Sequence, residues 1–448
     1  MDKIEGIQSW QVIQQKNGFG SITFIDEIGV PDDKFWQGIW SDVCGYIGMV
    51  SFRFVEEDTD RPVTPWVDSE RIDEFTVKCT IEKIPAGGLY RLEQRIHFTD
   101  RPDRIKIRST HINHVGVGDV FLVAGQSNAA GYGRGIQTEC AEIGISVLRK
   151  HNMWDLASNP LCDFHSPFLS FAKLLHKKLG YPIGLIPRAV GGVPISSWSG
   201  DGVLINQVKT EAPELYPNIT AVLWYQGCSD VGEKLYEQYE DKFNNMTEQM
   251  RALFANDELP FFTFQLNRVT DDINTKLNYV GYTKMRNVQR KIAKEQNNVY
   301  IIPTIDALKM SDEIHNSKIN NMMLGERLGY MVLDEVYHLL RADKAPDISK
   351  AEVFGNELTL VFDNVVGTVT VYGVNVKDLP ISVKDDKGDV PCSSYKCDGN
   401  RIVIELERAT EGEVLVSAMA GALPVGIIMD TETQLPSLCF DELKAVLG

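Results

Sequence analysis

The chain has 448 residues, of which 43% are hydrophobic and 24% are charged, and this composition excludes a disordered or fibrous protein. At roughly 150 residues per domain, the length predicts about three domains. The 62 acidic and 45 basic side chains give a formal net charge of −17. Because such a chain repels phosphate backbones and anionic lipid, neither nucleic acid nor a membrane surface is expected as a partner.

No uninterrupted apolar stretch approaches the ~20 residues of a membrane-spanning helix. The N-terminal stretch MDKIEGIQSWQVIQQ also lacks the apolar core of a signal peptide. We therefore expect a cytoplasmic protein, or a secreted or periplasmic one if a signal peptide has been removed. The eight cysteines are scattered and form no C-x2-C pair, which favours reduced thiols over a zinc site. A Cys392–Cys397 bridge across a hairpin stays open.

Residues 1–118 contain short β-type runs separated by turn signals such as Pro85-Ala86-Gly87-Gly88. Convincing helical periodicity is lacking in this stretch. We therefore predict an N-terminal all-β, sandwich-like module over residues 1–118. The runs are Tyr46–Val55, Phe75–Ile81, Leu89–Phe98 and Arg104–Asn113.

Residues 119–341 alternate between strand and helix patterns, which predicts an α/β domain with a parallel sheet covered by helices on both faces. Five apolar runs are typical of buried parallel strands: Val120–Ala124, Ile183–Pro187, Ala221–Tyr225, Phe261–Gln265 and Val299–Thr304. Four stretches have apolar residues at helical spacing: roughly 166–180, 235–253, 283–296 and 323–340.

After residue 341 the β texture returns. We predict a C-terminal all-β module over residues 342–448, so that the order of the three parts is β, then α/β, then β. The runs that indicate it are Glu357–Asp363, Thr368–Gly373, Arg401–Leu406 and Glu413–Ala418.

Polar and small residues follow the predicted central strands. In an open α/β sheet, ligands bind outside the carboxyl ends of the strands, so these residues are expected at one edge. Together they supply a hydroxyl, two oxyanion donors and a carboxylate that can orient an imidazole. Each is commonplace alone, but their placement at successive strand ends predicts acyl transfer through a covalent acyl-enzyme. In chain order they are Ser127, the Gly191-Gly192 pair, Gln226, and Asp312 with His315.

Four motifs contain these residues: GQSN at 125–128, AVGGVPISSW at 189–198, WYQGCSD at 224–230 and DEIH at 312–315. They resemble the conserved blocks of SGNH/GDSL hydrolases, and more narrowly those of the sialate O-acetylesterase group of carbohydrate acetylesterases. The Gly-x-Ser-x-x-x-Gly spacing differs from the Gly-x-Ser-x-Gly elbow of α/β-hydrolases. Turns at 85–88, 398–400 and 421–424 also resemble the flanking β regions of that group. The resemblance therefore spans nearly the whole chain and implies a flavodoxin-like SGNH hydrolase domain between two β modules.

The resemblance implies a role for each residue of the site. Ser127 would be the nucleophile. His315 would be the general base and then the acid toward the leaving sugar oxygen, and Asp312 would orient His315. The oxyanion hole would consist of the backbone N–H groups of Ser127 and Gly192 and the side-chain amide of Gln226.

Three positions depart from the pattern of the family. The family commonly has Glu after WYQG, whereas this chain has Cys228. It often has Pro after the late Ile-His, whereas this chain has Asn316, and Ala129 stands where Met is usual. None of these departures removes a triad member or an oxyanion donor. The carboxylate of the family could brace the loop that presents Gln226. With Cys228 at this position, the sequence leaves open which residue does so here.

Five further residues are candidates for contacts with substrate. Gln126 and Asn128 flank the nucleophile. Trp198 follows the glycine pair and would either stack on a sugar ring or pack in the core. Arg188 and Arg268 follow strands at the catalytic edge, where each would bind a carboxylate such as that of a sialic acid or, as we favour, form a structural ion pair.

Neither a metal ion nor a cofactor is expected. His111 and His114 have no third ligand nearby in the sequence. Gly131-Tyr132-Gly133 lacks the third glycine of a dinucleotide-binding fingerprint.

We therefore predict a serine esterase that removes O-acetyl groups from an acetylated sugar or glycan through an acetyl-serine intermediate, with sialic acid as the first candidate. An acetylxylan esterase, another glycan acetylesterase or a small-ester lipase stays open. So does a non-catalytic carbohydrate-binding protein, which Cys228 favours and the intact Ser–Asp–His set disfavours. None of these motifs encodes the identity of the sugar or the acetylated position. The oligomeric state also stays open, and a homo-oligomer is one possibility.

Overall fold

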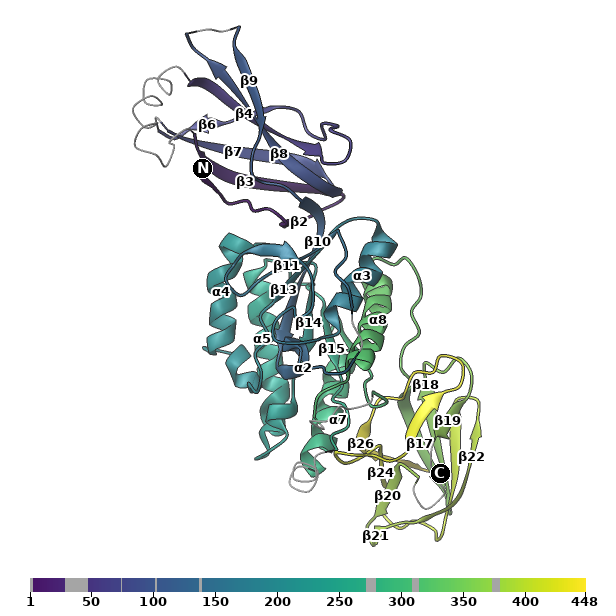
Figure 1. Ribbon diagram of the computed structural model, residues 1–448. Helices are drawn as coiled ribbons and strands as arrows, with labels where there is room; N and C mark the ends of the chain where they lie inside the picture. The colour runs from purple at the N-terminus through teal and green to yellow at the C-terminus, as the bar shows by residue number, and fades with distance from the viewer. Residues whose placement is uncertain are drawn as a thin grey trace.

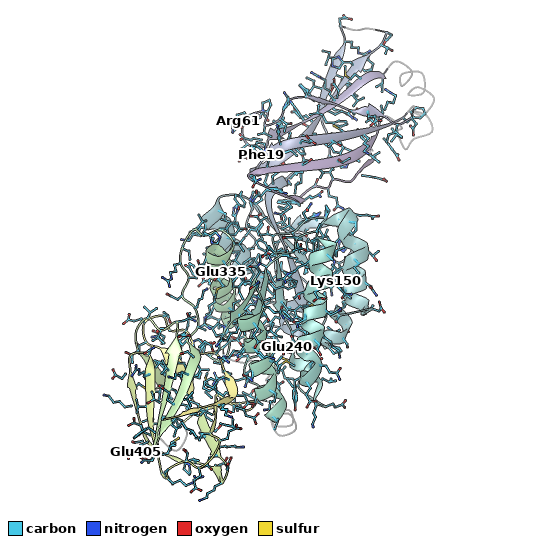
Figure 2. All side chains as sticks on the ribbon, turned by 180° about the vertical axis from the view of Figure 1, so that it is seen from behind. Phe19, Arg61, Lys150, Glu240, Glu335 and Glu405 are labelled. Atoms are coloured by element: carbon cyan, nitrogen blue, oxygen red, sulfur yellow. The ribbon has the colours of Figure 1, made fainter. Side chains whose placement is uncertain are left out.

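The computed structural model describes residues 3–28, 47–73, 75–100, 103–136, 139–270, 279–307, 314–372 and 379–448. Three parts follow one another along an elongated molecule: a β-rich N-terminal part, a mixed α/β middle part and a β-rich C-terminal part (Figure 1). Each contains its own cluster of buried hydrophobic side chains. Charged side chains surround all three parts, as Arg61, Glu240 and Glu405 illustrate (Figure 2).

Two sheets pack against each other in the N-terminal part. Side chains of β3 alternate between exposed and buried positions, and Phe24 of β3 meets Phe52 of β4 edge to face at 4.9 Å. The core therefore lies between the sheets. One sheet consists of β1 (Lys3–Glu5), β3 (Phe19–Glu27), β7 (Thr76–Pro85) and β6 (Glu70–Arg71). The remaining strands are β2 (Val12–Gln14), β4 (Ile47–Glu56), β5 (Val67–Asp68), β8 (Gly87–Phe98) and β9 (Ile105–Ser109).

One long strand, β10 (Val115–Gly125), connects the N-terminal sheet to the middle part and is buried along its whole length. Its first residues pair with β2 and β8. From Asp119 onward it pairs in parallel with β13 (Ile183–Pro187) on one side, and from Phe121 with β14 (Ala221–Tyr225) on the other. The predicted strands at 183–187 and 221–225 are therefore confirmed at both ends.

The sheet of the middle part is parallel except at one edge. Only β12 pairs antiparallel with its neighbour, while the other pairs are parallel. The strand order is β12 (Trp154–Leu156), β11 (Ile145–Leu148), β13, β10, β14, β15 (Phe261–Phe264) and β16 (Val299–Ile302).

Helices cover both faces of this sheet (Figure 1). On one face α3 (Phe168–Leu179) packs against α8 (Lys318–Glu335). The two helices approach closely at Gly325, where a Cβ atom would lie 2.2 Å from the carbonyl oxygen of Pro167. The helices α4 (Val203–Leu215), α5 (Tyr239–Leu253) and α7 (Tyr279–Glu295) also belong to this part.

Helix boundaries differ from the prediction where caps and turns decide them. α8 begins at Lys318 rather than near 323, because the Ser317 hydroxyl accepts a hydrogen bond from the Asn320 backbone N–H at 3.3 Å and caps the helix. The predicted helix at 235–253 starts with a 3-10 turn (Leu235–Gln238) before α5. The sequence patterns gave no indication of α4, which contains Pro213.

The C-terminal part contains sheets and turns in its described residues. Cys392 and Cys397 both lie on β22 and both are free, so the bridge that the sequence left open is not formed. One sheet consists of β22 (Cys392–Asp398), β23 (Arg401–Leu406), β18 (Glu357–Asp363), β17 (Asp347–Phe354) and β27 (Val446–Leu447). A second consists of β21 (Gly388–Asp389), β20 (Ile381–Asp385), β24 (Leu415–Ala418) and β26 (Phe440–Lys444), and a third of β19 (Val369–Tyr372) and β25 (Ile427–Asp430).

A search of the described residues finds no helix of sufficient length and apolar character to span a bilayer.

Candidate active site

The turn that carries Ser127 lies between β10 and the short helix α2 (Ser127–Ala130). Gly125 has a φ of +126°, and a Cβ atom there would lie 2.3 Å from the carbonyl oxygen of Tyr225. Only glycine fits this approach, which lets the Gln126 backbone N–H bond the Tyr225 carbonyl at 3.0 Å. In the sheet β10 lies between β13 and β14: the strands β11 and β13 that come next in the chain lie on one side, and β14, β15 and β16 lie on the other. Such a reversal of strand order marks the usual ligand crevice of an α/β sheet.

Gln126 ties this turn to the loop that follows β14. Its Oε1 accepts hydrogen bonds from the backbone N–H groups of Gly227 and Ser229, at 3.1 Å and 3.2 Å. Its Nε2 lies 3.3 Å from the Ser229 hydroxyl. Gln126 is buried, so in this structure its side chain supports the loop and is not free for substrate.

Asp230 joins the two loops that carry the predicted oxyanion donors. Its Oδ2 accepts a hydrogen bond from the backbone N–H of Ile195, beside the glycine pair, at 3.0 Å. The same oxygen accepts one from Nε2 of Gln226 at 2.5 Å. Burial raises the pKa of the Asp230 carboxyl. Asp230 therefore braces Gln226 in this chain, which has Cys228 where the resemblance led us to expect a carboxylate.

Two of the three candidate oxyanion donors, Gly192 and Gln226, differ in their availability. Gly192 has a φ of +73°, and a Cβ atom there would meet open space, so the backbone is accessible at this point. Gln226 is fully buried, and its Nε2 bonds both Asp230 and the carbonyl oxygen of Val193, the latter at 3.2 Å. An oxyanion would therefore have to replace the Val193 carbonyl as the acceptor for Gln226.

We expect Asp230→Ala to lower the free energy of unfolding by about 2–4 kcal/mol, because two buried donors lose their acceptor. Asp230→Asn keeps a side-chain oxygen that can accept both bonds and should cost less than about 1 kcal/mol. Urea unfolding of the two variants measures the difference. Equal losses in both would show that the two hydrogen bonds are not what Asp230 contributes.

The segment that carries His315 lies beside the Ser127 turn. The His315 ring stacks on Tyr132, with ring centroids 4.8 Å apart and planes inclined by 29°. The backbone N–H of Asn316 donates to Oδ1 of Asn128 at 3.3 Å. The residues that directly follow Ser127 and His315 are thus hydrogen-bonded to each other. Asp312 lies outside the described residues.

The segment of Ser127 and the segment of His315 also contact each other through their backbones, at the residues that follow Tyr132 and Asn316. Arg134 forms a parallel bridge with Ser317, and the Lys318 N–H donates to the Arg134 carbonyl at 3.0 Å. At Gly133 a Cβ atom would lie 2.3 Å from Nδ2 of Asn321. Glycine therefore allows the two segments to run side by side.

Trp198 and Arg188 are structural in this conformation. Trp198 is fully buried, donates from Nε1 to the Gly125 carbonyl at 3.2 Å and packs edge to face on Trp224 at 5.5 Å. A ring in this position offers no face to a sugar, so of the two roles that the sequence left open for Trp198 the structure supports packing in the core and not contact with substrate. Arg188 is buried and its Nε donates to Glu211 at 2.5 Å, which agrees with the ion pair that we favoured.

Arg268 follows β15 at the same edge of the sheet and is partly buried. Burial lowers the pKa of its guanidinium, and the nearby Asp306 carboxylate opposes that effect. No hydrogen bond or ion pair of its side chain is found among the described residues. Of the five predicted substrate contacts, Arg268 alone therefore keeps a side chain that could serve an anionic ligand, since Asn128 is buried and bonded to Asn316.

Sequence reasoning missed Asp230 and Tyr132 as parts of the site, and it named Asn316 only as a departure from the pattern of the family. Asp230 and Tyr132 stand inside motifs already quoted, but nothing in a single sequence distinguishes a bracing residue from its neighbours. Within the described residues, no three His, Cys, Asp or Glu side chains are grouped so as to hold a metal ion. His114 instead pairs with Glu57, with Nδ1 2.7 Å from Oε2.

Residues 117–334 match the family described as carbohydrate esterase, sialic acid-specific acetylesterase. This match confirms, over the matched residues, the resemblance that the motifs indicate. The chain is 32% identical over 171 residues to a probable carbohydrate esterase of Arabidopsis thaliana, which covers 32% of this chain and 65% of that protein. It is 27% identical over 143 residues to the sialate O-acetylesterase of Homo sapiens, covering 26% of this chain and 27% of that protein. The chain thus spans less than two thirds of the length of these relatives.

Among solved structures, the fold resembles the crystal structure of a novel carbohydrate acetylesterase from Xanthomonas citri, with a TM-score of 0.68 and 18% sequence identity. The similarity covers 98% of this chain and 99% of that one. It shows that a mixed α/β fold of this kind occurs in a carbohydrate acetylesterase.

Proposed function

We propose that this protein is a serine esterase that removes O-acetyl groups from a carbohydrate. The single observation that carries the proposal is the hydrogen bond between Asn128 and Asn316, since it joins the segment of Ser127 to that of His315. A hydroxyl and an imidazole held together beside backbone N–H groups are the parts that acyl transfer needs. The family match over residues 117–334 supports the same reaction.

In this proposal the Ser127 hydroxyl loses its proton to His315 and its oxygen attacks the acetyl carbonyl carbon. The carbonyl oxygen gains negative charge, which the N–H groups of Ser127 and Gly192, joined by the Gln226 amide, stabilise. His315 then gives the proton to the sugar oxygen, the ester bond breaks, and the acetyl group stays on Ser127. Water activated by His315 next releases acetate, and Asp312 orients the imidazole in both halves of the cycle.

The proposed domain division follows the sequence: residues 1–118, 119–341 and 342–448, with a β module on each side of a flavodoxin-like SGNH hydrolase domain. The order β13, β10, β14, β15 and β16 supports it, because these five strands, counted along the chain without the edge strands β11 and β12, read 2-1-3-4-5. The unbroken run of β10 through residue 118 means that the first two domains would share one strand.

We propose sialic acid as the first candidate substrate and an acetylated xylan or other glycan as the alternative. The relative named sialate O-acetylesterase supports the first. Arg268 also supports it, because a sialic acid carries a carboxylate that a guanidinium at this edge would recognise.

The function is tested by measuring acetate release from O-acetylated sialosides, acetylated xylan and acetylated neutral sugars. We expect release from at least one acetylated sugar, with sialosides preferred. Arg268→Ala should then raise KM for sialosides by about 10-fold or more and leave KM for neutral sugars unchanged, because a charge-assisted bond is worth roughly 1.5–3 kcal/mol. No acetate from any substrate would contradict the proposal, and an equal effect of Arg268→Ala on all substrates would contradict the sialic acid assignment.

A further inference from the structure

Asn316 directly follows His315 in the sequence and is fully buried. Its Oδ1 accepts a hydrogen bond from Nδ2 of Asn267 at 2.7 Å. Its Nδ2 donates to the Tyr225 hydroxyl at 3.2 Å, and its backbone N–H donates to Oδ1 of Asn128. One residue thus joins the His315 segment to the ends of β14 and β15 and to the nucleophile turn.

The groups that hold Asn316 are themselves fixed. The Tyr225 ring is buried and stacks on Phe264 with centroids 4.6 Å apart. Nδ2 of Asn267 also donates to the carbonyl oxygen of Ala307 at 3.0 Å. The amide of Asn316 therefore meets partners that have little freedom to follow it if it moves.

Arg286 is fully buried and lies against the backbone of the loop that carries Asn267. Its guanidinium donates to the backbone carbonyls of Leu266 and Asn267, at 2.8 Å and 2.9 Å. It also donates to the carbonyls of Gly421 and Ala422 of the C-terminal part. This arginine clamps the loop after β15 against the C-terminal part and so keeps Asn267 in position under Asn316.

The backbone bond requires that residue 316 have an N–H group. Proline has none, so a proline at this position could not bond Asn128. The amide side chain also uses one acceptor and one donor at once, which an aliphatic side chain cannot do. Asparagine at 316 therefore supplies connections that neither proline nor an aliphatic residue would provide.

We propose that Asn316 is a positioning residue that holds the His315 ring in register with Ser127. The inference rests on the proposed function and deepens it. Asn316 acts only through His315: it fixes where the imidazole stands and takes no part in proton transfer. Misplacement of a catalytic group by about 1 Å can cost roughly 100-fold in rate, and this sets the scale of the expected effect.

The test is steady-state kinetics on an aryl acetate with Asn316→Ala, His315→Ala and the double variant. We expect Asn316→Ala to lower kcat by about 10- to 100-fold with KM within about twofold. In the His315→Ala background the same change should have no further effect, because a residue that acts through His315 has nothing left to position. An equal fractional loss in both backgrounds, or an unchanged kcat in Asn316→Ala, would overturn the inference and leave the proposed function standing. Full activity of His315→Ala would instead contradict the proposed function.

Two further variants separate positioning from stability. Asn321→Ala removes another buried asparagine of the same segment, whose Nδ2 donates to the His165 carbonyl at 2.9 Å. It should lower the thermal midpoint while leaving kcat within about twofold. Tyr225→Phe removes only the hydroxyl that bonds Asn316 and should lower kcat by about two- to 10-fold. If Asn316→Ala does not fold, the kcat of Tyr225→Phe serves as the test instead. An unchanged kcat in Tyr225→Phe would then overturn the inference.

Discussion

Replacing Ser127 by alanine should lower kcat for an aryl acetate by about 10³- to 10⁶-fold, because the variant has no hydroxyl to form the acetyl-enzyme. The residual rate would come from binding and from the oxyanion donors, which the change leaves in place. Ser127 stands at the first position of α2 and its side chain caps no helix, so the fold should tolerate alanine. Steady-state kinetics on the purified variant measures the loss.

The matched control is Ser349→Ala, which removes a serine hydroxyl from β17 of the C-terminal part, where it bonds the Val361 carbonyl at 3.0 Å. This variant should keep its full kcat, and both variants should retain the circular dichroism spectrum of the parent. Turnover by Ser127→Ala within about 10-fold of the parent would contradict a serine nucleophile at this position.

Replacing Gly125 by alanine should lower the free energy of unfolding by about 3–5 kcal/mol. The new Cβ would lie 2.3 Å from the Tyr225 carbonyl oxygen at a φ of +126°, so it would meet a clash and an unfavourable backbone conformation at once. Separating β10 from β14 there would also disturb Trp198, whose Nε1 bonds the Gly125 carbonyl. Urea unfolding measures the loss.

Gly180→Ala is the control for this prediction. Gly180 ends α3 with a φ of +75°, and a Cβ there would meet no atom within 4 Å. Its substitution should lower the free energy of unfolding by about 1–2 kcal/mol, because only the left-handed backbone conformation disfavours alanine there. If Gly125→Ala cost no more than Gly180→Ala, the close approach of β10 and β14 would not be what requires glycine.

The strands around the site were predictable because a buried parallel strand reads as an unbroken apolar run. β13 and β14 begin and end at the predicted residues. The residues after such strands share one edge of the sheet, so the sequence alone predicts a common site for Ser127, Gly192 and Gln226. Asp312, by contrast, lies outside the described residues and its role stays a prediction.

Other features depend on tertiary partners that no local pattern encodes. The tryptophan at 198 could be assigned equally to a sugar site or to the core, and only its burial against Trp224 decides for the core. Asp230 stands four residues after Gln226, but its second partner, Ile195, comes from another loop. Asn316 likewise bonds residues from three different segments, and a chain of contacts so distant in sequence leaves no periodicity to read.

Whether Ser127 is the nucleophile is tested most directly by covalent labelling with an organophosphonate that mimics the acyl-transfer transition state, followed by peptide mass spectrometry. We expect one adduct per chain, located on Ser127, with esterase activity lost in proportion to its formation and with slower labelling in His315→Ala. A protein that binds carbohydrate without hydrolysing esters would remain unlabelled at Ser127. An unlabelled Ser127, or full activity after complete labelling, would show that Ser127 is not the nucleophile of an esterase.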